Sequence, residues 1–170
     1  MNRSRRKKLQ ESSWFAVVRA YQECNRRYAQ LLHEFDLTIS QFDVLAAVQT
    51  LGERAMPNAI ADELVVTRGN VTGVLQRLKE RGLLATRSHE RDGRSFICEL
   101  TSAGSDLLRQ ARSSAAIFID QQLAPFDDTE LKHTETQMNT MRLHLQTIDP
   151  LAIARRVREK GFRTREVSAR

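Results

Sequence analysis

The segment from residue 67 to residue 101 carries two successive patterns of apolar and polar positions. In its first half the apolar residues recur three and four positions apart, which predicts a helix with one buried face made of Val71, Val74, Leu75 and Leu78. We expect this helix to end at Gly82, because glycine readily takes the left-handed conformation that follows many helices. In the second half, strands are predicted over 83–87 and 96–100, the latter with one apolar face made of Phe96, Cys98 and Leu100. Asp92-Gly93 between them is a typical hairpin turn.

The opposite face of the predicted helix carries small residues and short polar side chains instead of long charged ones. Gly69 and Gly73 lie on it, and each destabilises a helix by roughly 1 kcal/mol relative to alanine. Thr67 is expected to cap the helix, with its hydroxyl accepting from an amide of the first turn. Such a face suits close approach to another surface, as a helix in the major groove of DNA requires. The residues expected to contact base edges and phosphates are Thr67, Arg68, Asn70, Thr72, Gln76 and Arg77.

Three helices are predicted upstream of this segment. Apolar residues step at threes and fours from about Leu9 to Phe35, which predicts one long amphipathic helix. Thr38 and Gln41 form a capping box that starts a helix to about residue 51, with Phe42, Leu45, Ala46 and Val48 as its buried stripe. A short helix over 57–64 follows. A short helix, a turn and a longer capped helix are the helix-turn-helix arrangement.

Two long helices are predicted downstream, over about 101–124 and from Asp127 or Asp128 to 148, followed by a basic tail that is helical from about 151 to 160. The apolar stripes of the first helix and of these two lack a partner within so small a domain. We infer that they pack against a second copy in a two-fold dimer, while a monomeric three-helix cap is the alternative. The expected organisation is a disordered basic arm (1–8), a single domain (9–148) and a basic tail (149–170). Within the domain, 9–37 and 102–148 would dimerise and 38–101 would form the winged lobe.

Positive charge is concentrated at three places along the 170 residues, whose net charge is +6. Residues 1–8 hold five basic side chains and no acids, residues 67–94 hold seven against three, and residues 152–170 hold seven against two. A solubilising pattern would intersperse the signs more evenly, so nucleic acid is the favoured partner. In the hairpin, the arginines expected to reach phosphates or a narrow minor groove are Arg87, Arg91 and Arg94, with Asp92 holding one of them by an ion pair.

Other classes of protein are disfavoured by the sequence. The basic start is not followed by the apolar stretch of a secretory signal, and the longest apolar runs are too short to span a membrane, so a cytoplasmic, nucleoid-associated protein is expected. Cys24 and Cys98 lack CxxC spacing, and the four histidines make no metal-ligand spacing with them. No glycine-rich loop is present to hold phosphates. We therefore expect no metal, no cofactor and no enzymatic activity.

The ordered set of residues along the chain resembles the MarR (multiple antibiotic resistance regulator) family of winged helix-turn-helix repressors. The resemblance covers roughly residues 10–148, and the matching positions are Leu37-Thr38, Gln41, Leu45, Thr67-Arg68, 78–83, Arg87, 92–94, Leu100-Thr101 and Gly104. It implies a mainly α fold with a small β-wing, a long-helix dimerisation region, and a homodimer that binds a pseudo-palindromic operator in double-stranded DNA. One departure is Gly93, where the family usually has arginine, and it removes one basic contact from the wing tip.

The resemblance also implies regulation, for which two interpretations are open. Family members bind small aromatic acids between the dimer helices and the DNA-binding lobe, where the expected wall residues are Trp14, Tyr21, Phe42 and Arg94. In some relatives a cysteine of the first helix senses oxidation; Cys24 fits that position, and Arg26 and Arg27 beside it could lower the thiol pKa. Against this, Cys24 lies on the apolar face of its helix, as a small buried residue would. A winged-helix module that binds proteins is the alternative from another class.

Overall fold

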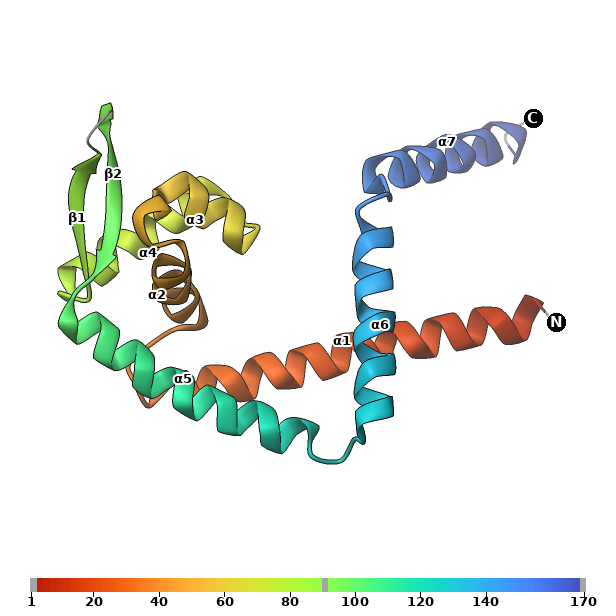
Figure 1. The fold of residues 1–170 in the computed structure, drawn as a ribbon. Helices are drawn as coiled ribbons and strands as arrows, with labels where there is room; N and C mark the ends of the chain where they lie inside the picture. The colour runs from red at the N-terminus through yellow and green to blue at the C-terminus, as the bar shows by residue number, and fades with distance from the viewer. Residues whose placement is uncertain (1–2, 90–91, 169–170) are drawn as a thin grey trace. The chain divides into compact units, whose positions relative to one another are not determined.

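The computed structural model describes residues 3–89 and 92–168, and side chains at 89–95 and from 160 onward lie outside the description. The described part is mainly helical with one two-stranded antiparallel sheet, as predicted. Its elements, drawn in Figure 1, are α1 (Arg3–His33), α2 (Ile39–Leu51), the 3-10 helix η1 (Gly52–Arg54), α3 (Pro57–Leu64), α4 (Arg68–Glu80), β1 (Leu84–His89), β2 (Asp92–Leu100), α5 (Ser102–Leu123), α6 (Asp128–Leu145) and α7 (Pro150–Ser168).

The chain divides into two compact units, Met1–Gln121 and Gln122–Arg170. The first holds the helix-turn-helix, the hairpin, α1 and most of α5, and the second holds α6 and α7. This boundary lies inside α5. Among the described residues, no helix combines the length and the apolar character that crossing a membrane requires.

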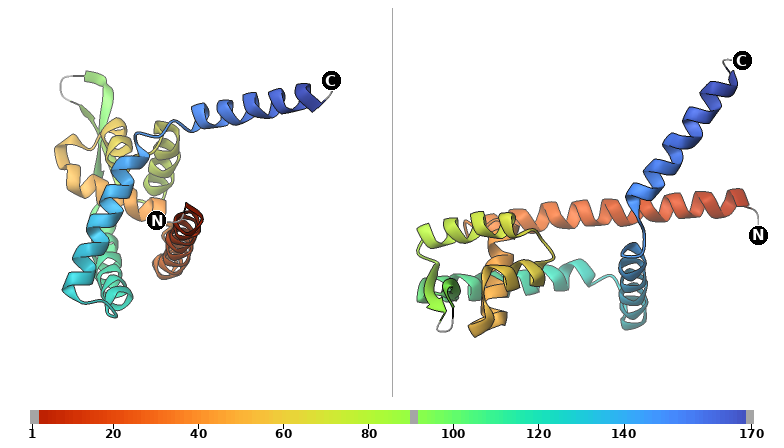
Figure 2. Two further views of the ribbon diagram at one scale, coloured as in Figure 1. Left: turned by 90° about the vertical axis from the view of Figure 1, so that its right-hand side faces the viewer. Right: turned by 90° about the horizontal axis from the view of Figure 1, so that it is seen from above.

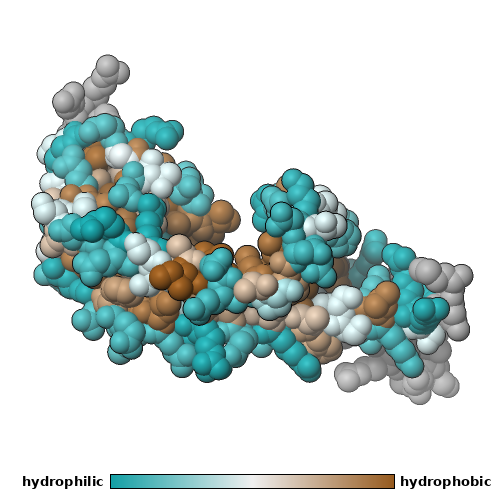
Figure 3. All heavy atoms as spheres, turned by 60° about the horizontal axis from the view of Figure 1, so that its bottom comes forward, coloured by the Kyte–Doolittle hydropathy of each residue, from teal (hydrophilic) through white to brown (hydrophobic). Residues whose placement is uncertain are grey.

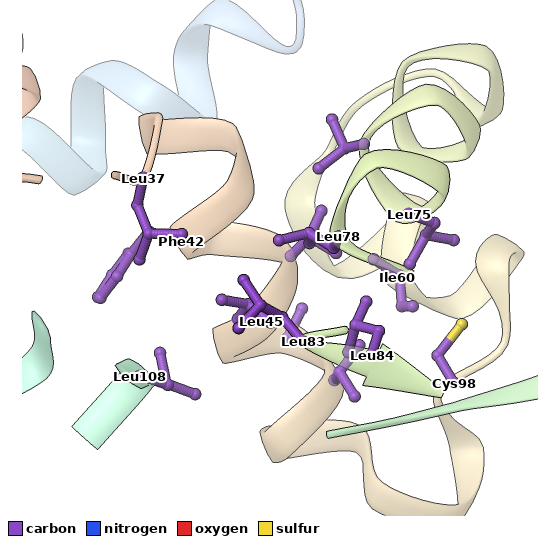
Figure 4. Close-up of a cluster of buried hydrophobic side chains, with 14 of the residues drawn as sticks. Leu37, Phe42, Leu45, Ile60, Leu75, Leu78, Leu83, Leu84, Cys98 and Leu108 are labelled. Carbon is purple, nitrogen blue, oxygen red and sulfur yellow. The ribbon is translucent and has the colours of Figure 1, made fainter. Parts of the chain in front are cut away.

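The core of the first unit is built around α2. Leucines from α4, the hairpin and α5 converge on Phe42 and Leu45 of α2, as Figure 4 shows. The predicted stripe of α2 is confirmed at Phe42, Leu45 and Val48, but Val44 and Ala47 are buried as well. α2 contacts α1, α3, α4 and β2, so it is covered on nearly every side, and a helix in that position is apolar all round.

Local hydrogen bonds fix where the helices of the lobe begin and end. The predicted capping box is confirmed, because the Gln41 amide donates to the Thr38 hydroxyl (3.2 Å) and the Thr38 amide donates to the Gln41 side chain (2.9 Å). Gly82 ends α4 with φ +69°, as expected, and the Leu83 amide donates to the Leu78 carbonyl. The expectation for Thr67 is wrong: it stands at the N-cap of α4, but its side chain makes no capping bond. Its carbonyl instead accepts from the amides of the first turn.

The hairpin is longer than the sequence pattern indicated. β1 pairs with β2 from Leu84↔Leu100 to His89↔Asp92, with an irregularity of register between Ser88 and His89. Asp92 therefore starts β2, and the predicted turn at Asp92-Gly93 is wrong, because pairing continues past the point where the apolar alternation stops. The expected apolar face is also corrected. Ile97 is buried beside Cys98, whereas Phe96 is exposed.

A close contact joins the end of α4 to the start of α5. The Thr101 hydroxyl donates to the Gly82 carbonyl (2.7 Å) and accepts from the Gly104 amide (3.0 Å). A Cβ atom on Gly104 would lie 2.0 Å from the Leu83 carbonyl oxygen. Only glycine fits where α5 crosses this backbone. We call Gly82, Leu83, Thr101 and Gly104 the α4–α5 junction.

The N-terminal segment differs from the expected disordered arm. Arg3–Lys8 form the first turns of α1, since arginine and lysine are good helix formers and Lys7 lies 3.9 Å from Glu11 one turn on. α1 then continues as one helix that extends well beyond the winged lobe (Figures 1 and 2). Only near its end does α1 pack into the core, where Leu32 is fully buried.

The second unit consists of two helices with clear start signals. Asp127 and Glu130 form a capping box for α6, which settles the choice between Asp127 and Asp128 in favour of the former. The Asp149 carboxylate accepts from the amides of Leu151 (2.8 Å) and Ala152 (2.9 Å) at the start of α7. α7 extends to Ser168, beyond the predicted end near residue 160.

Candidate nucleic-acid interface

The polar face of α4 is exposed, as its sequence predicted. Its four apolar residues are buried in the lobe, and the side chains on the other face are exposed; they are Thr67, Arg68, Asn70, Thr72, Gln76 and Arg77. A Cβ atom on Gly69 would meet nothing within 4 Å, and one on Gly73 would meet only the Arg77 guanidinium at 3.9 Å. The fold therefore does not require either glycine. Because glycine has no side chain, the surface of α4 is shallow at these two positions and open to an external partner.

Two polar groups on this face already have partners within α4. The Thr72 hydroxyl donates to the Arg68 carbonyl (3.0 Å), and the side-chain amide of Gln76 donates to the Glu80 carboxylate (2.8 Å). Arg68, Asn70 and Arg77 are more directly available for a new contact. A groove of about 680 Å³ runs along one side of the face, between α4 and the start of α2. The half-buried Asp43 lines it, and burial raises the pKa of its carboxyl.

Arg87 lies at the base of the hairpin and is held by carboxylates from two other elements. Its guanidinium donates to Glu53 of η1 and to Glu99 of β2, and its side chain is about one-third exposed at 34 %. The sequence indicated Arg87 as a DNA contact but did not indicate either glutamate. Arg87 also lines a groove of about 320 Å³ together with Thr72 and Gln76 of the α4 face.

The predicted interface also includes residues near the tip of the hairpin. The side chains of Arg91, Asp92 and Arg94 lie outside the described residues. Their contacts with DNA, and the ion pair expected of Asp92, stay predictions. The hairpin that carries them is anchored to the lobe, because the Cys98 amide of β2 donates to the Ala55 carbonyl after η1 (2.8 Å).

The residues predicted to line a ligand site are not gathered in one place. Trp14 and Tyr21 are exposed on α1, with Trp14 edge-on to Phe15, whereas Phe42 is buried in the core. Phe42 packs instead against Tyr28, with ring centroids 5.9 Å apart, and Tyr28 packs against Phe118 of α5 at 5.6 Å. Tyr28 and Phe118 belong to the apolar stripes of their helices, but spacing along one helix does not predict which stripes meet.

Cys24 lies half-buried on α1, beside an ion-paired cluster. Glu23 accepts from Arg26 (2.6 and 3.0 Å) and from Arg27 (2.8 Å), and these hydrogen bonds lower the pKa of its carboxyl to about 2. The two arginines proposed to activate the thiol are therefore both paired with a carboxylate.

Cys98 has a different environment from Cys24. It is buried, and burial raises the pKa of its thiol to about 11. In the described part of the chain neither cysteine forms a disulfide, and no group of histidine, cysteine and acidic residues is arranged to hold a metal ion.

Residues 35–95 match the family model described as "MarR family". An uncharacterised HTH-type transcriptional regulator of Bacillus cereus is 29 % identical over 125 residues, covering 74 % of this chain and 80 % of the relative.

Solved structures share the fold at low sequence identity. The organohalide-sensing regulator RdhR, in a form bound to 2,4-dichlorophenol, superposes with a TM-score of 0.73 at 18 % identity, over 85 % of each chain. A MarR mutant from E. coli, complexed with operator DNA, superposes with a TM-score of 0.67 at 22 % identity, over 74 % of this chain and 90 % of that one.

Proposed function

Because this chain is a MarR-family winged helix-turn-helix protein, we propose that it is a transcriptional regulator that binds double-stranded DNA as a homodimer. The observation that carries the proposal is the exposed face of α4, where two glycines unneeded by the fold separate Arg68, Asn70 and Arg77. Arginine and asparagine make bidentate contacts with guanine and adenine in the major groove. The glycines allow the helix backbone to approach the bases.

The wing has a separate role in this proposal. Arg91 and Arg94 contact phosphates or enter the minor groove beside the site read by α4, with Asp92 orienting an arginine. Arg87 positions the hairpin through Glu53 and Glu99 and contributes less to DNA directly. Contacts with phosphates fix the register of the protein on DNA, whereas α4 selects the sequence.

Dimer formation is supported by large apolar side chains that are more than half exposed in their own unit. Trp14 and Tyr21 of α1 are 59 % and 69 % exposed, and Ile117 and Ile119 of α5 are also exposed. Brown apolar atoms reach the surface at several places on the face drawn in Figure 3. A two-fold dimer would cover such surfaces and present two copies of α4 about one helical turn of DNA apart, ~34–36 Å, to a pseudo-palindromic operator.

We also propose that the protein is a repressor and that a small aromatic ligand releases it from DNA. RdhR, which shares the fold, is bound to 2,4-dichlorophenol in its structure. A ligand that binds better to a conformation with the two copies of α4 misplaced would shift the population away from DNA. Oxidation of Cys24 is the alternative, and the ion pairs of Arg26 and Arg27 with Glu23 favour the ligand.

The test is selection of binding sites from random duplex DNA by the purified protein, followed by footprinting on the best site. We expect a two-fold symmetric footprint with half-sites about one helical turn apart.

A second experiment separates the two modes of regulation. It compares release of the protein from DNA by a panel of phenolic and aromatic acids with release by peroxide, for the wild type and for Cys24→Ser. Binding without sequence selectivity would favour a winged-helix module that binds other proteins.

A further inference from the structure

The turn between α3 and α4 contains a valine in a conformation that valine rarely adopts. Val65 has φ +55° and ψ +43°, the left-handed region, at the position after the end of α3. Its amide donates to the Asp62 carbonyl (3.2 Å), and the Val66 amide donates to the Ala61 carbonyl (3.0 Å), as in a Schellman motif. Glycine is the usual residue at this position, because a Cβ atom there crowds the following carbonyl.

Valine is among the least suitable residues for this conformation, since its branched Cβ adds to the crowding. Among the described residues only one other non-glycine has positive φ, Asp36 at +53°. Aspartate tolerates the left-handed region far better. The turn thus carries backbone strain at Val65 that glycine or asparagine would relieve.

The strain is not offset by burial. Val65 is 90 % exposed, and the next residue, Val66, is 43 % exposed. An exposed valine contributes almost no hydrophobic stabilisation to its own fold, so the packing of this chain gives no reason for it. A strained residue that is not stabilised by its surroundings points to a contact made outside the chain.

The position of Val65 identifies that contact. It lies two residues before Thr67, the N-cap of α4, whose hydroxyl makes no capping bond. Val66 lines the groove beside α4 together with Gly69 and Asn70. Val65 precedes Val66 in the same turn and is the more exposed of the two, so the turn adds apolar side chains just before the N-terminal end of α4. Thymine is the one base that offers an apolar group, its C5-methyl, in the major groove.

We propose that Val65 selects thymine in the operator by packing against its C5-methyl group. The proposal rests on the proposed function, since it needs α4 to lie in the major groove. It assigns the apolar part of sequence recognition to the turn, while Arg68, Asn70 and Arg77 supply hydrogen bonds to neighbouring positions.

The experiment uses the full-length protein and its selected duplex, with each thymine replaced in turn by deoxyuridine, which lacks only the methyl group. At one symmetric pair of positions the wild type should lose affinity about threefold to fivefold per half-site, the value of one buried methyl group. Val65→Asn and Val65→Gly should bind the thymine duplex as weakly as the wild type binds the deoxyuridine duplex. Neither variant should lose further affinity when deoxyuridine replaces thymine in the duplex. Both should melt at or above the wild-type temperature, because strain is relieved.

Asp36→Asn is the matched control, since it changes the other left-handed residue and should leave DNA affinity unchanged. Asp36 contacts the C-terminal end of α4, where its carbonyl accepts from the Arg81 guanidinium (2.6 Å), and asparagine keeps that carbonyl. If Val65→Asn binds as tightly as the wild type, or loses the same factor on deoxyuridine substitution, the contact does not exist. If Val65→Asn instead alters self-association or protein binding at unchanged DNA affinity, the valine serves a protein partner and the proposal fails. A wild type without sequence selectivity would overturn the proposed function as well, so the two failures are distinct.

Discussion

At the scale of single residues, Gly73 and Gly104 have opposite surroundings, so substitutions at these two glycines test DNA binding and folding separately. Gly73 lies on the exposed face of α4 with room for a Cβ atom, whereas Gly104 meets the Leu83 carbonyl oxygen at the α4–α5 junction. The first glycine weakens its helix without any contact that needs it, and the second permits a close backbone approach.

We predict that Gly73→Ala raises the free energy of unfolding by about 0.5–1 kcal/mol, because alanine is the better helix former. The same change should weaken sequence-selective DNA binding at least tenfold, since the added methyl group holds the backbone of α4 away from the bases. Chemical denaturation and fluorescence anisotropy measure the two effects.

Gly104→Ala is the comparison. It should destabilise the protein by about 2–4 kcal/mol, because backbone must move to admit the Cβ atom. A Gly73→Ala variant that keeps full DNA affinity would show that α4 does not approach DNA closely.

At the scale of elements, Arg87 is one of the links between the hairpin and the rest of the lobe, beside the hydrogen bond from the Cys98 amide to the Ala55 carbonyl. It joins β1 to Glu53 of η1 and to Glu99 of β2. Both ion pairs are partly exposed to solvent. The hairpin is otherwise a two-stranded sheet, which alone is marginally stable in water. Its orientation therefore depends on such links to the lobe.

We predict that Arg87→Ala lowers the free energy of unfolding by only about 0.5–1.5 kcal/mol, because partly exposed ion pairs contribute little. It should increase amide hydrogen exchange in β1 and β2 more than in α2. The double variant Glu53→Gln with Glu99→Gln keeps Arg87 free for DNA and should loosen the hairpin similarly. If only Arg87→Ala weakens DNA binding and neither variant changes exchange, Arg87 is a direct DNA contact.

Features within one element were largely predictable from the sequence. The buried face of α4, the capping box at Thr38, the start of α6 at Asp127 or Asp128 and the end of α4 at Gly82 follow from local spacing and were confirmed. Local chemistry decides these features, so a single stretch of sequence contains the information.

Features that depend on distant partners were missed or misjudged. Nothing near Arg87 in the sequence indicates Glu53, and the stripe of Tyr28 does not name Phe118 as its partner. α2 was given one buried stripe, although four neighbours bury Val44 and Ala47 as well. In the candidate site, the exposed face of α4 was predicted, whereas the positive φ of Val65 was not, because valine, unlike glycine, gives no indication of that conformation.

At the scale of the whole molecule, self-association depends on the exposed apolar side chains of α1. Trp14 is exposed on the part of α1 that extends beyond the winged lobe, and only Phe15 contacts its ring among the aromatic residues described. A single charged residue there would oppose burial in a dimer interface without disturbing the core.

We predict that Trp14→Glu shifts the protein from dimer to monomer at micromolar concentration, as measured by analytical ultracentrifugation. Melting of the winged lobe should change little, because Trp14 does not belong to its core. Ser12→Glu, which places the same charge two residues earlier on the same helix, should remain dimeric. A dimeric Trp14→Glu protein, or a wild type that is already monomeric, would contradict the proposed role of α1.

The α4–α5 junction has a mechanical consequence. Because Thr101 bridges Gly82 and Gly104 with no space between the backbones, the end of α4 and the start of α5 rotate as one piece. α5 has 22 residues, so at 1.5 Å per residue it is a lever about 33 Å long with its pivot at α4. A rotation of 5° at the pivot displaces the far end of that lever by roughly 3 Å. Force applied near Phe118 would therefore turn α4, the helix proposed to contact DNA, through a small angle.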